Sequence, residues 1–208
     1  MLGIVALALS GCVYAQIPAD DGAGPDPVDG GSPSAEPLEG GLPEELTFAA
    51  GQDLPDGSYI QWGDGFIADE GWEIREPDNG HGEWMYGTTD GRCTARFWQG
   101  LIRDSEVADE GVRDDEKGSD LLLASVLDLS EQELAAAVNT GRFSYLVGGT
   151  GVVENRWASG QDGDRSWIVA ARSFTEPGVG LWVAVECYAV DAQPRMDEVY
   201  EKNPVVVS

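Results

Sequence analysis

The chain has 208 residues, and 38 acidic against 12 basic residues give it a formal net charge of −26. Nucleic-acid binding needs clustered Lys and Arg, and anionic lipids repel an acidic surface, so we expect no nucleic-acid partner and no membrane contact through the folded surface. With one histidine and no Cys-x-x-Cys pair, neither a metal site nor another cofactor is expected.

The chain opens with an apolar run, Leu2–Leu9, that is too short to cross a bilayer as a helix, which takes about 20 residues. Two small residues and a cysteine follow, and Leu9-Ser10-Gly11-Cys12 resembles the lipobox of bacterial lipoproteins. The resemblance implies that residues 1–11 are a signal peptide and that Cys12 carries acyl chains such as palmitate. This lipid would hold the protein on the extracytoplasmic side of the cell membrane.

A leader of this kind also needs a basic segment, and no Lys or Arg precedes Arg75. We therefore expect the basic segment upstream of Met1. The alternative is that Leu2–Leu9 is a core strand or helix of a cytosolic protein. A core element should lead into folded sequence, whereas this run leads into a linker.

Residues 12–45 are expected to be the lipidated cysteine and a disordered linker. The stretch 13–45 holds six Pro, six Gly, eight acidic residues and no Lys or Arg, a composition that cannot bury enough apolar surface to fold. Residues 46–208 should form a single globular domain, which holds all seven tryptophans and a net charge of −18. We attribute this charge to solubility; an acidic patch for a basic partner is the alternative.

Alternating apolar residues and turn signals predict four strands in the first half of the domain: Ser58–Trp62, Gly71–Arg75, Trp84–Tyr86 and Arg92–Gln99. Thr89-Asp90-Gly91 supplies a hairpin turn between the last two. Two helices should follow. One is capped by Ser119 and runs to Leu127, and the other opens with the capping box Ser130–Glu133 and ends near Asn139.

The second half predicts an antiparallel meander of four strands: Arg142–Val147, Val152–Ala158, Arg165–Phe174 and Val179–Val190. A last helix begins at Pro194 and places Met196, Val199 and Tyr200 on one packing face. This order predicts an α+β fold, a mainly antiparallel sheet with helices packed on one face. It is similar to the element order of the domain shared by the photosystem II extrinsic P protein and some mycobacterial lipoproteins, and the likeness carries over no functional residue.

The lipobox uses Cys12, which leaves Cys93 and Cys187 as an even pair in an oxidising compartment. Both fall in step with the apolar alternation of their strands, so both thiols are expected to point inward and to form one disulfide. Two buried free thiols are the alternative.

Motifs for nucleophilic catalysis are missing from the sequence. Neither Gly-x-Ser-x-Gly nor Ser-x-x-Lys occurs, and His81 lies in a turn, where an exposed loop histidine is the simpler interpretation. The loop 104–116 crowds acidic residues but lacks the EF-hand spacing, so we favour a solvated charged loop over a cation site.

Four tryptophans are candidates for contacting a ligand such as a cell-wall glycan: Trp62, Trp72, Trp84 and Trp98. Two carboxylates flanking a sugar would instead make an acid-pair hydrolase of cell-wall or exogenous polysaccharide, and five acidic residues lie close by in sequence: Asp64, Asp69, Glu70, Glu73 and Glu83. Some acid lies near every tryptophan in so acidic a chain, so we assign no catalytic residue.

The favoured function is a non-catalytic binding or interaction module of the cell envelope, displayed on a spacer. Its partner would be a cell-wall glycan, a small solute or an envelope protein. The acid-pair hydrolase and a purely structural spacer domain are the alternatives.

Overall fold

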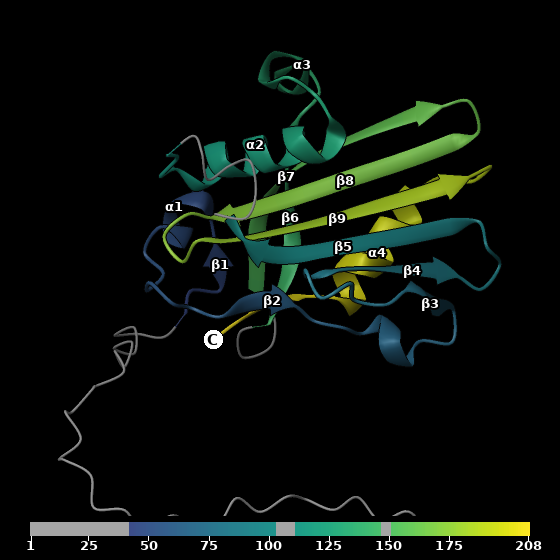
Figure 1. The fold of residues 1–208 in the computed structure, drawn as a ribbon, viewed down its shortest axis with the longest axis horizontal. Helices are drawn as coiled ribbons and strands as arrows, with labels where there is room; N and C mark the ends of the chain where they lie inside the picture. Colours follow the sequence, from purple (N-terminus) through teal and green to yellow (C-terminus); the bar gives the residue numbers. More distant parts are fainter. Residues whose placement is uncertain (1–41, 103–110, 147–150) are drawn as a thin grey trace, which may run out of the picture. The chain divides into compact units, whose positions relative to one another are not determined.

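The computed structural model of the protein describes residues 42–102, 111–146 and 151–208. The lipobox, nearly all of the predicted linker and most of the acidic loop 104–116 lie outside the described residues. Within these ranges ten strands form one sheet in the order β2-β10-β6-β7-β8-β9-β5-β4-β3, with β1 paired to β7 (Figure 1).

Strands dominate this part of the chain. The elements are, in order, β1 Glu45–Leu46, α1 Phe48–Gly51, β2 Ile60–Trp62, the 3-10 turn η1 Phe66–Ala68, β3 Trp72–Glu76, β4 Glu83–Thr88, β5 Cys93–Leu101, α2 Asp115–Leu127, α3 Glu131–Ala135, β6 Asn139–Leu146, β7 Gly151–Asp162, β8 Arg165–Phe174, β9 Val179–Tyr188, α4 Gln193–Lys202 and β10 Val205–Val207.

Most strand pairs are antiparallel, as predicted. The four strands β6 to β9 form the expected meander, and β3, β4 and β5 continue it on the far side of β9. Two short strands, β1 and β10, instead pair in parallel with β7 and β6. The result is a curled, mostly antiparallel sheet with four helices, for which α+β is only a loose description.

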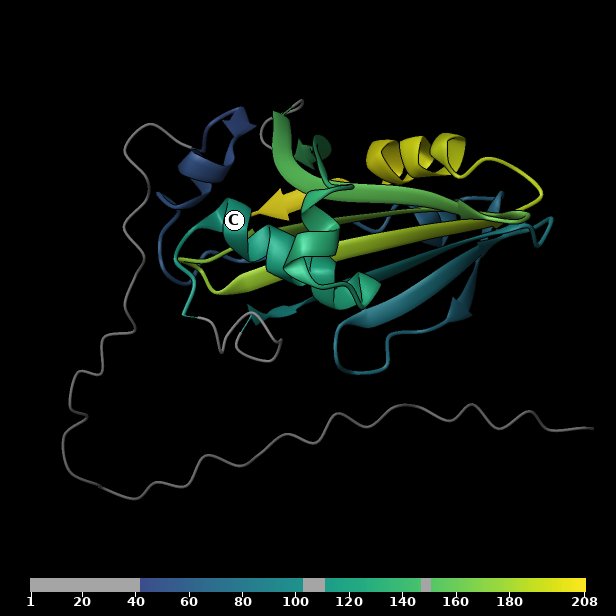
Figure 2. The same cartoon turned by 90° about the horizontal axis from the view of Figure 1, so that it is seen from above.

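The helices do not share one face of the sheet, which corrects the sequence prediction. On β8, Ile168 and Ala170 belong to the core cluster that includes Met196 of α4, whereas Val169 and Ala171 pack with α2. Figure 2 shows α4 and α2 on opposite sides of β8 and β9. Because apolar residues occupy both faces of β8, each face needs its own cover. We call the face toward α4 inner and the face toward α2 outer.

Helix α2 begins earlier than the sequence predicts. Its N-cap is Asp114, whose side chain accepts a hydrogen bond from the backbone N–H of Lys117 at 2.7 Å. The predicted cap, Ser119, is buried one turn further on, where its hydroxyl donates to the carbonyl of Asp115 at 2.6 Å and accepts from the N–H of Ser173 at 2.8 Å. Ser119 therefore fastens α2 to β8 rather than starting the helix.

The other two predicted helices are confirmed with changed ends. Both hydrogen bonds of the capping box between Ser130 and Glu133 are present at the start of α3. That helix ends at Ala135, because the chain enters β6 at Asn139. Helix α4 carries Pro194 in its first turn and buries Met196 and Val199, as its spacing predicts.

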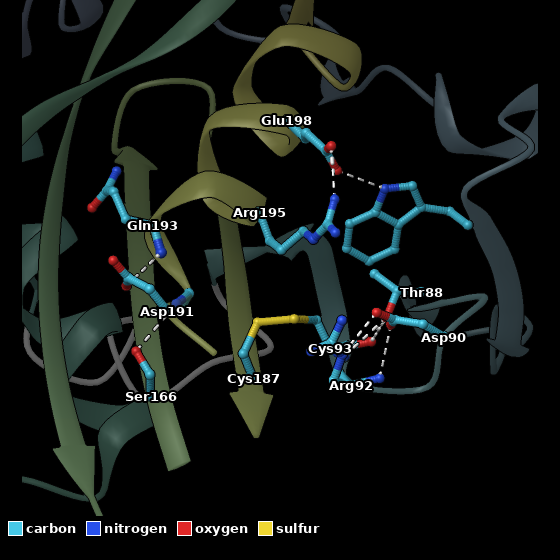
Figure 3. The surroundings of a disulfide bond; sticks show 12 residues. Thr88, Asp90, Arg92, Cys93, Ser166, Cys187, Asp191, Gln193, Arg195 and Glu198 are labelled. Carbon is cyan, nitrogen blue, oxygen red and sulfur yellow. Dashed lines mark hydrogen bonds and ion pairs between the residues drawn. A yellow bond between two sulfur atoms is a disulfide. The ribbon is translucent and has the colours of Figure 1, made fainter. Parts of the chain in front are cut away.

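The predicted disulfide is present and joins two neighbouring strands. Cys93 and Cys187 lie directly opposite each other on β5 and β9, and both side chains are buried (Figure 3). The adjoining hairpin turn is held by Asp90, whose carboxylate accepts hydrogen bonds from the Thr88 hydroxyl and from Arg92. The crosslink thus closes the end of the sheet at a well-ordered turn.

A buried charged pair fastens the N-terminal elements to the sheet. The Arg172 guanidinium on β8 donates to Asp115 Oδ2 at 2.8 Å and to the carbonyl of Thr47 at 3.1 Å. It lies over the rings of Phe48 and Phe174, with its Cζ 4.5 and 4.6 Å from their centroids. Burial lowers the pKa of Arg172 to about 10 and raises the pKa of Asp115. The pair joins α1, α2 and β8.

Candidate functional site

The structure places the four candidate tryptophans in three different settings. Trp62 and Trp72 are each 4% exposed, and Trp72 stacks on Phe66 with ring centroids 4.2 Å apart. Trp84 is half-buried on the inner face, whereas Trp98 lies on the outer face and stacks on Trp182. The four therefore do not form one aromatic surface.

On the outer face, tryptophans cover glycines of their own or a neighbouring strand. The indole of Trp98 occupies the space where Gly100 and Gly180 would otherwise carry a Cβ, and the indole of Trp167 does the same over Gly160. A large ring laid over a glycine restores the packing that the missing side chain leaves out. The positions of the Trp98 and Trp167 indoles are therefore explained by packing.

A groove of about 430 Å³ on the outer face borders these rings. Its walls include Trp167 and Trp182, and its charged groups are already paired within the protein. Arg96 forms an ion pair with Glu83 at 2.9 Å, and Arg165 forms one with Glu186. A ligand in this groove would have to compete with these internal pairs.

A second cavity, of about 300 Å³, lies on the inner face where β2, the edge strand, faces β3 and β4. We call it the edge cleft. Its lining includes six polar or aromatic residues: Trp62, Asp64, Glu76, Asp78, Trp84 and Gln99. They come from four strands, β2 to β5, and from the segments that follow β2 and β3. Only the curl of the sheet brings them together.

The floor of the edge cleft is aromatic and rigidly held. The Trp84 indole stacks on Phe97 with centroids 5.4 Å apart and an interplanar angle of 6°. Beside it the Tyr86 hydroxyl donates to Asp64 Oδ1 at 2.8 Å. Burial, and then the neighbouring carboxylate, raise the pKa of Tyr86, so this phenol stays a hydrogen-bond donor at neutral pH.

The rim of the edge cleft is acidic. Glu76 has Arg96 at 3.4 Å, but no ion pair among the residues that the structure describes involves Asp64 or Asp78. Both residues are exposed to solvent, so their carboxylates can accept hydrogen bonds from a ligand. The cleft therefore favours a ligand with an apolar part and a cationic or hydrogen-bond-donating part.

Three of the five acids considered for hydrolysis form ion pairs. Asp69 pairs with Lys202 at 2.6 Å, and Glu73, like Glu83, pairs with an arginine. The hydrogen bond from Lys202 lowers the pKa of Asp69, which is opposite to what a general acid needs. Burial raises the pKa of Asp115, but this side chain is fully buried against Arg172 and lies away from the edge cleft.

His81 is exposed in a turn, as the sequence predicts. Across residues 42–102, 111–146 and 151–208, no group of three or more His, Cys, Asp or Glu side chains is placed to hold a metal ion. In the same ranges no helix combines the length and apolarity that crossing a bilayer requires.

No protein-family model matches the chain, and no curated protein is significantly similar to it. The edge cleft is therefore the candidate functional site. Sequence reasoning named Trp62, Trp84 and Asp64 but missed Tyr86 and Gln99. Tyr86 carried a usable signal, because it lies two residues after Trp84 and so shares its face of the strand. Gln99 carried none, since its partner is distant in sequence.

Proposed function

We propose that the protein is a cell-envelope lipoprotein, anchored through acyl chains on Cys12, whose domain is a non-catalytic binding module with the edge cleft as its ligand site. The observation that carries the binding function is the combination in this cleft of a stacked indole, a phenol that donates a hydrogen bond, and exposed carboxylates that form no ion pair with any residue the structure describes. Such a set recognises a ligand by stacking, hydrogen bonding and charge.

Two features of the sequence support the anchor. Leu9-Ser10-Gly11-Cys12 has the lipobox pattern, and the acidic, Pro- and Gly-rich stretch 13–45 has the composition of a spacer. The disulfide supports an extracytoplasmic location, because disulfides persist in oxidising compartments. A lipid on Cys12 would place the domain at the membrane without any apolar docking surface of its own.

The anchor is tested by comparing the full chain with a Cys12→Ser variant in a bacterial host that acylates lipoproteins. We expect the parent protein in the membrane fraction, with an N-terminal peptide whose mass includes acyl chains. Cys12→Ser should remove both properties. An unmodified N-terminus on a soluble parent protein would contradict the anchor.

The binding site is tested with a panel of glycan fragments, small amines and short peptides. A ligand that binds only the folded state raises the melting temperature. We expect such a shift to disappear in Trp84→Ala and to persist in Trp167→Ala, a matched change of a half-buried tryptophan on the outer face. The reverse pattern would move the site to the outer groove.

The acid-pair hydrolase is supported less well, since three of the five acids considered for it, Asp69, Glu73 and Glu83, form ion pairs with Lys or Arg side chains. Hydrolysis of a polysaccharide that depends on Asp64 or Asp78 would overturn the non-catalytic proposal.

A further inference from the structure

The edge cleft is bounded by β2, which within the described residues pairs with another strand, β10, on one side only. Tyr59 and Ser208 exchange two backbone hydrogen bonds, at 2.8 and 2.9 Å, so Tyr59 points its N–H and C=O toward β10. By the alternation of an antiparallel ladder, Ile60 and Trp62 point theirs away from β10. The N–H of Trp62 confirms this, because it donates across the cleft to the side chain of Gln99 at 2.8 Å. The carbonyl of Trp62 and both main-chain groups of Ile60 therefore point away from β10, with no strand paired to them among the described residues.

Apolar side chains are exposed along this same edge. A second hollow of about 340 Å³ lies at the start of β2 and shares Gln99 with the edge cleft. Five large hydrophobic side chains are exposed in the described ranges, and four of them line one or other of these two hollows: Tyr59, Ile67, Ile74 and Leu101. Clustered exposed apolar groups beside an open strand edge are typical of a binding surface.

The charge along the cleft is one-sided. Residues 64–83, which run from the end of β2 to the start of β4, contain seven acidic residues and a single arginine, and four of these acids form ion pairs with Lys or Arg side chains. That arginine, Arg75, is already paired with Glu73 at 2.7 Å. Asp64 and Asp78 at the rim lack cationic partners within the described residues. A basic ligand would be attracted and oriented by this surplus.

We propose that the edge cleft binds an extended basic segment of another protein, which pairs main chain to main chain with β2. This inference rests on the proposed binding function and names its partner class. The segment alternates apolar and basic side chains, since successive residues of a strand point to opposite sides. Its apolar side chains lie on the floor formed by Trp84 and Ile74. Its Lys or Arg side chains face Asp64 and Asp78.

The probe for this proposal is the blocked hexapeptide acetyl-Lys-Val-Lys-Val-Lys-Val-amide, titrated against the full chain by calorimetry. We expect saturable binding that weakens as salt is added. Two matched peptides separate the contribution of charge to the affinity from that of main-chain pairing. Glu in place of each Lys reverses the charge, and methylation of every backbone nitrogen keeps the charge but removes the donors that strand pairing needs. Both peptides should bind at least about tenfold more weakly.

On the protein side, the test is the double variant Asp64→Asn with Asp78→Asn. Asparagine keeps an acceptor for the Tyr86 hydroxyl, so the floor of the cleft should be preserved. We expect the affinity for the Lys-Val peptide to fall by about tenfold. The matched control is Asp162→Asn with Asp164→Asn, which makes the same change of net charge at the exposed β7–β8 turn and should leave the affinity unchanged.

Equal binding of the Lys-Val and Glu-Val peptides, or of the methylated and unmethylated peptides, would overturn the proposal. So would an equal loss of affinity in the two double variants, which would indicate general charge attraction. Failure of every peptide, together with a glycan or small amine whose binding depends on Trp84, would refute the peptide class while leaving the binding module intact. The state of Cys12 affects neither result.

Discussion

The two faces of the sheet use the same residue type in opposite ways. On the outer face, Trp98 and Trp167 cover glycines of their own or a neighbouring strand, and the nearby arginines are paired. On the inner face, Trp84 stacks on Phe97 at the floor of an open cleft whose rim carboxylates have no cation beside them in the described residues. Whether a tryptophan is available to a ligand is therefore indicated less by its exposure than by what lies beneath its ring and by whether the charged groups beside it are already paired.

The strongest way to disturb both faces together is to remove the disulfide, because β5 and β9 carry Trp98 and Trp182 outward and Gln99 inward. Cys93→Ser with Cys187→Ser, made in a Cys12→Ser background, should lower the free energy of unfolding by about 4–5 kcal/mol at most, as expected for a loop of this length. Urea denaturation measures the loss. Thiol labelling of the denatured, unreduced parent protein should modify neither Cys93 nor Cys187, and labelling of either would contradict the crosslink.

A loss of stability of similar size is expected when the buried ion pair that fastens α2 to the sheet is broken. Asp115→Ala leaves the Arg172 guanidinium buried without its carboxylate, which should cost about 3–5 kcal/mol of stability. The neighbouring change Asp114→Ala removes only the exposed helix cap and should cost about 1 kcal/mol. Equal costs in chemical denaturation would mean that the buried pair does not anchor the helix.

A smaller effect tests the outer-face packing directly. Gly160→Ala places a methyl group where the Trp167 indole lies, so we expect a loss of about 1–3 kcal/mol from forced repacking. In a Trp167→Ala background the same substitution should cost little, because the ring is gone. Additive losses in this double-mutant cycle would show that the indole does not depend on the glycine.

The smallest effect concerns the paired charges of the outer groove. The Arg165 side chain lowers the pKa of Glu186 below its ordinary 4.5. A carboxyl group with a lowered folded-state pKa stabilises the protein above the unfolded-state pKa, and this stabilisation is lost as the pH falls through the folded-state pKa. Glu186→Gln should therefore cost less than about 1 kcal/mol at neutral pH, and this cost should shrink as the pH falls below 4.5 and through the folded-state pKa. A cost that persists in acid would point to packing rather than charge.

Local signals in the sequence predicted most of the longer elements. The capping box at Ser130 and the meander from β6 to β9 follow from side-chain chemistry within a few residues. Helix α2 was misjudged at its start, because Ser119 resembles a cap in sequence but is buried against Ser173 in space. The short strands β1 and β10 were missed, since two or three residues hold too little pattern and pair with distant strands.

The sequence by itself determined the acidic charge, the cysteine pair and the alternation that points Cys93 and Cys187 inward. It also supplied the residues of the edge cleft, but as separate strand positions without a common location. Only the tertiary structure decided that the sheet curls, that α2 and α4 take opposite faces, and that Trp84, Asp64 and Gln99 meet beside the free edge of β2. The physical reason is that side-chain alternation is set between adjacent residues, whereas curl and edge position depend on long-range pairing across the whole sheet.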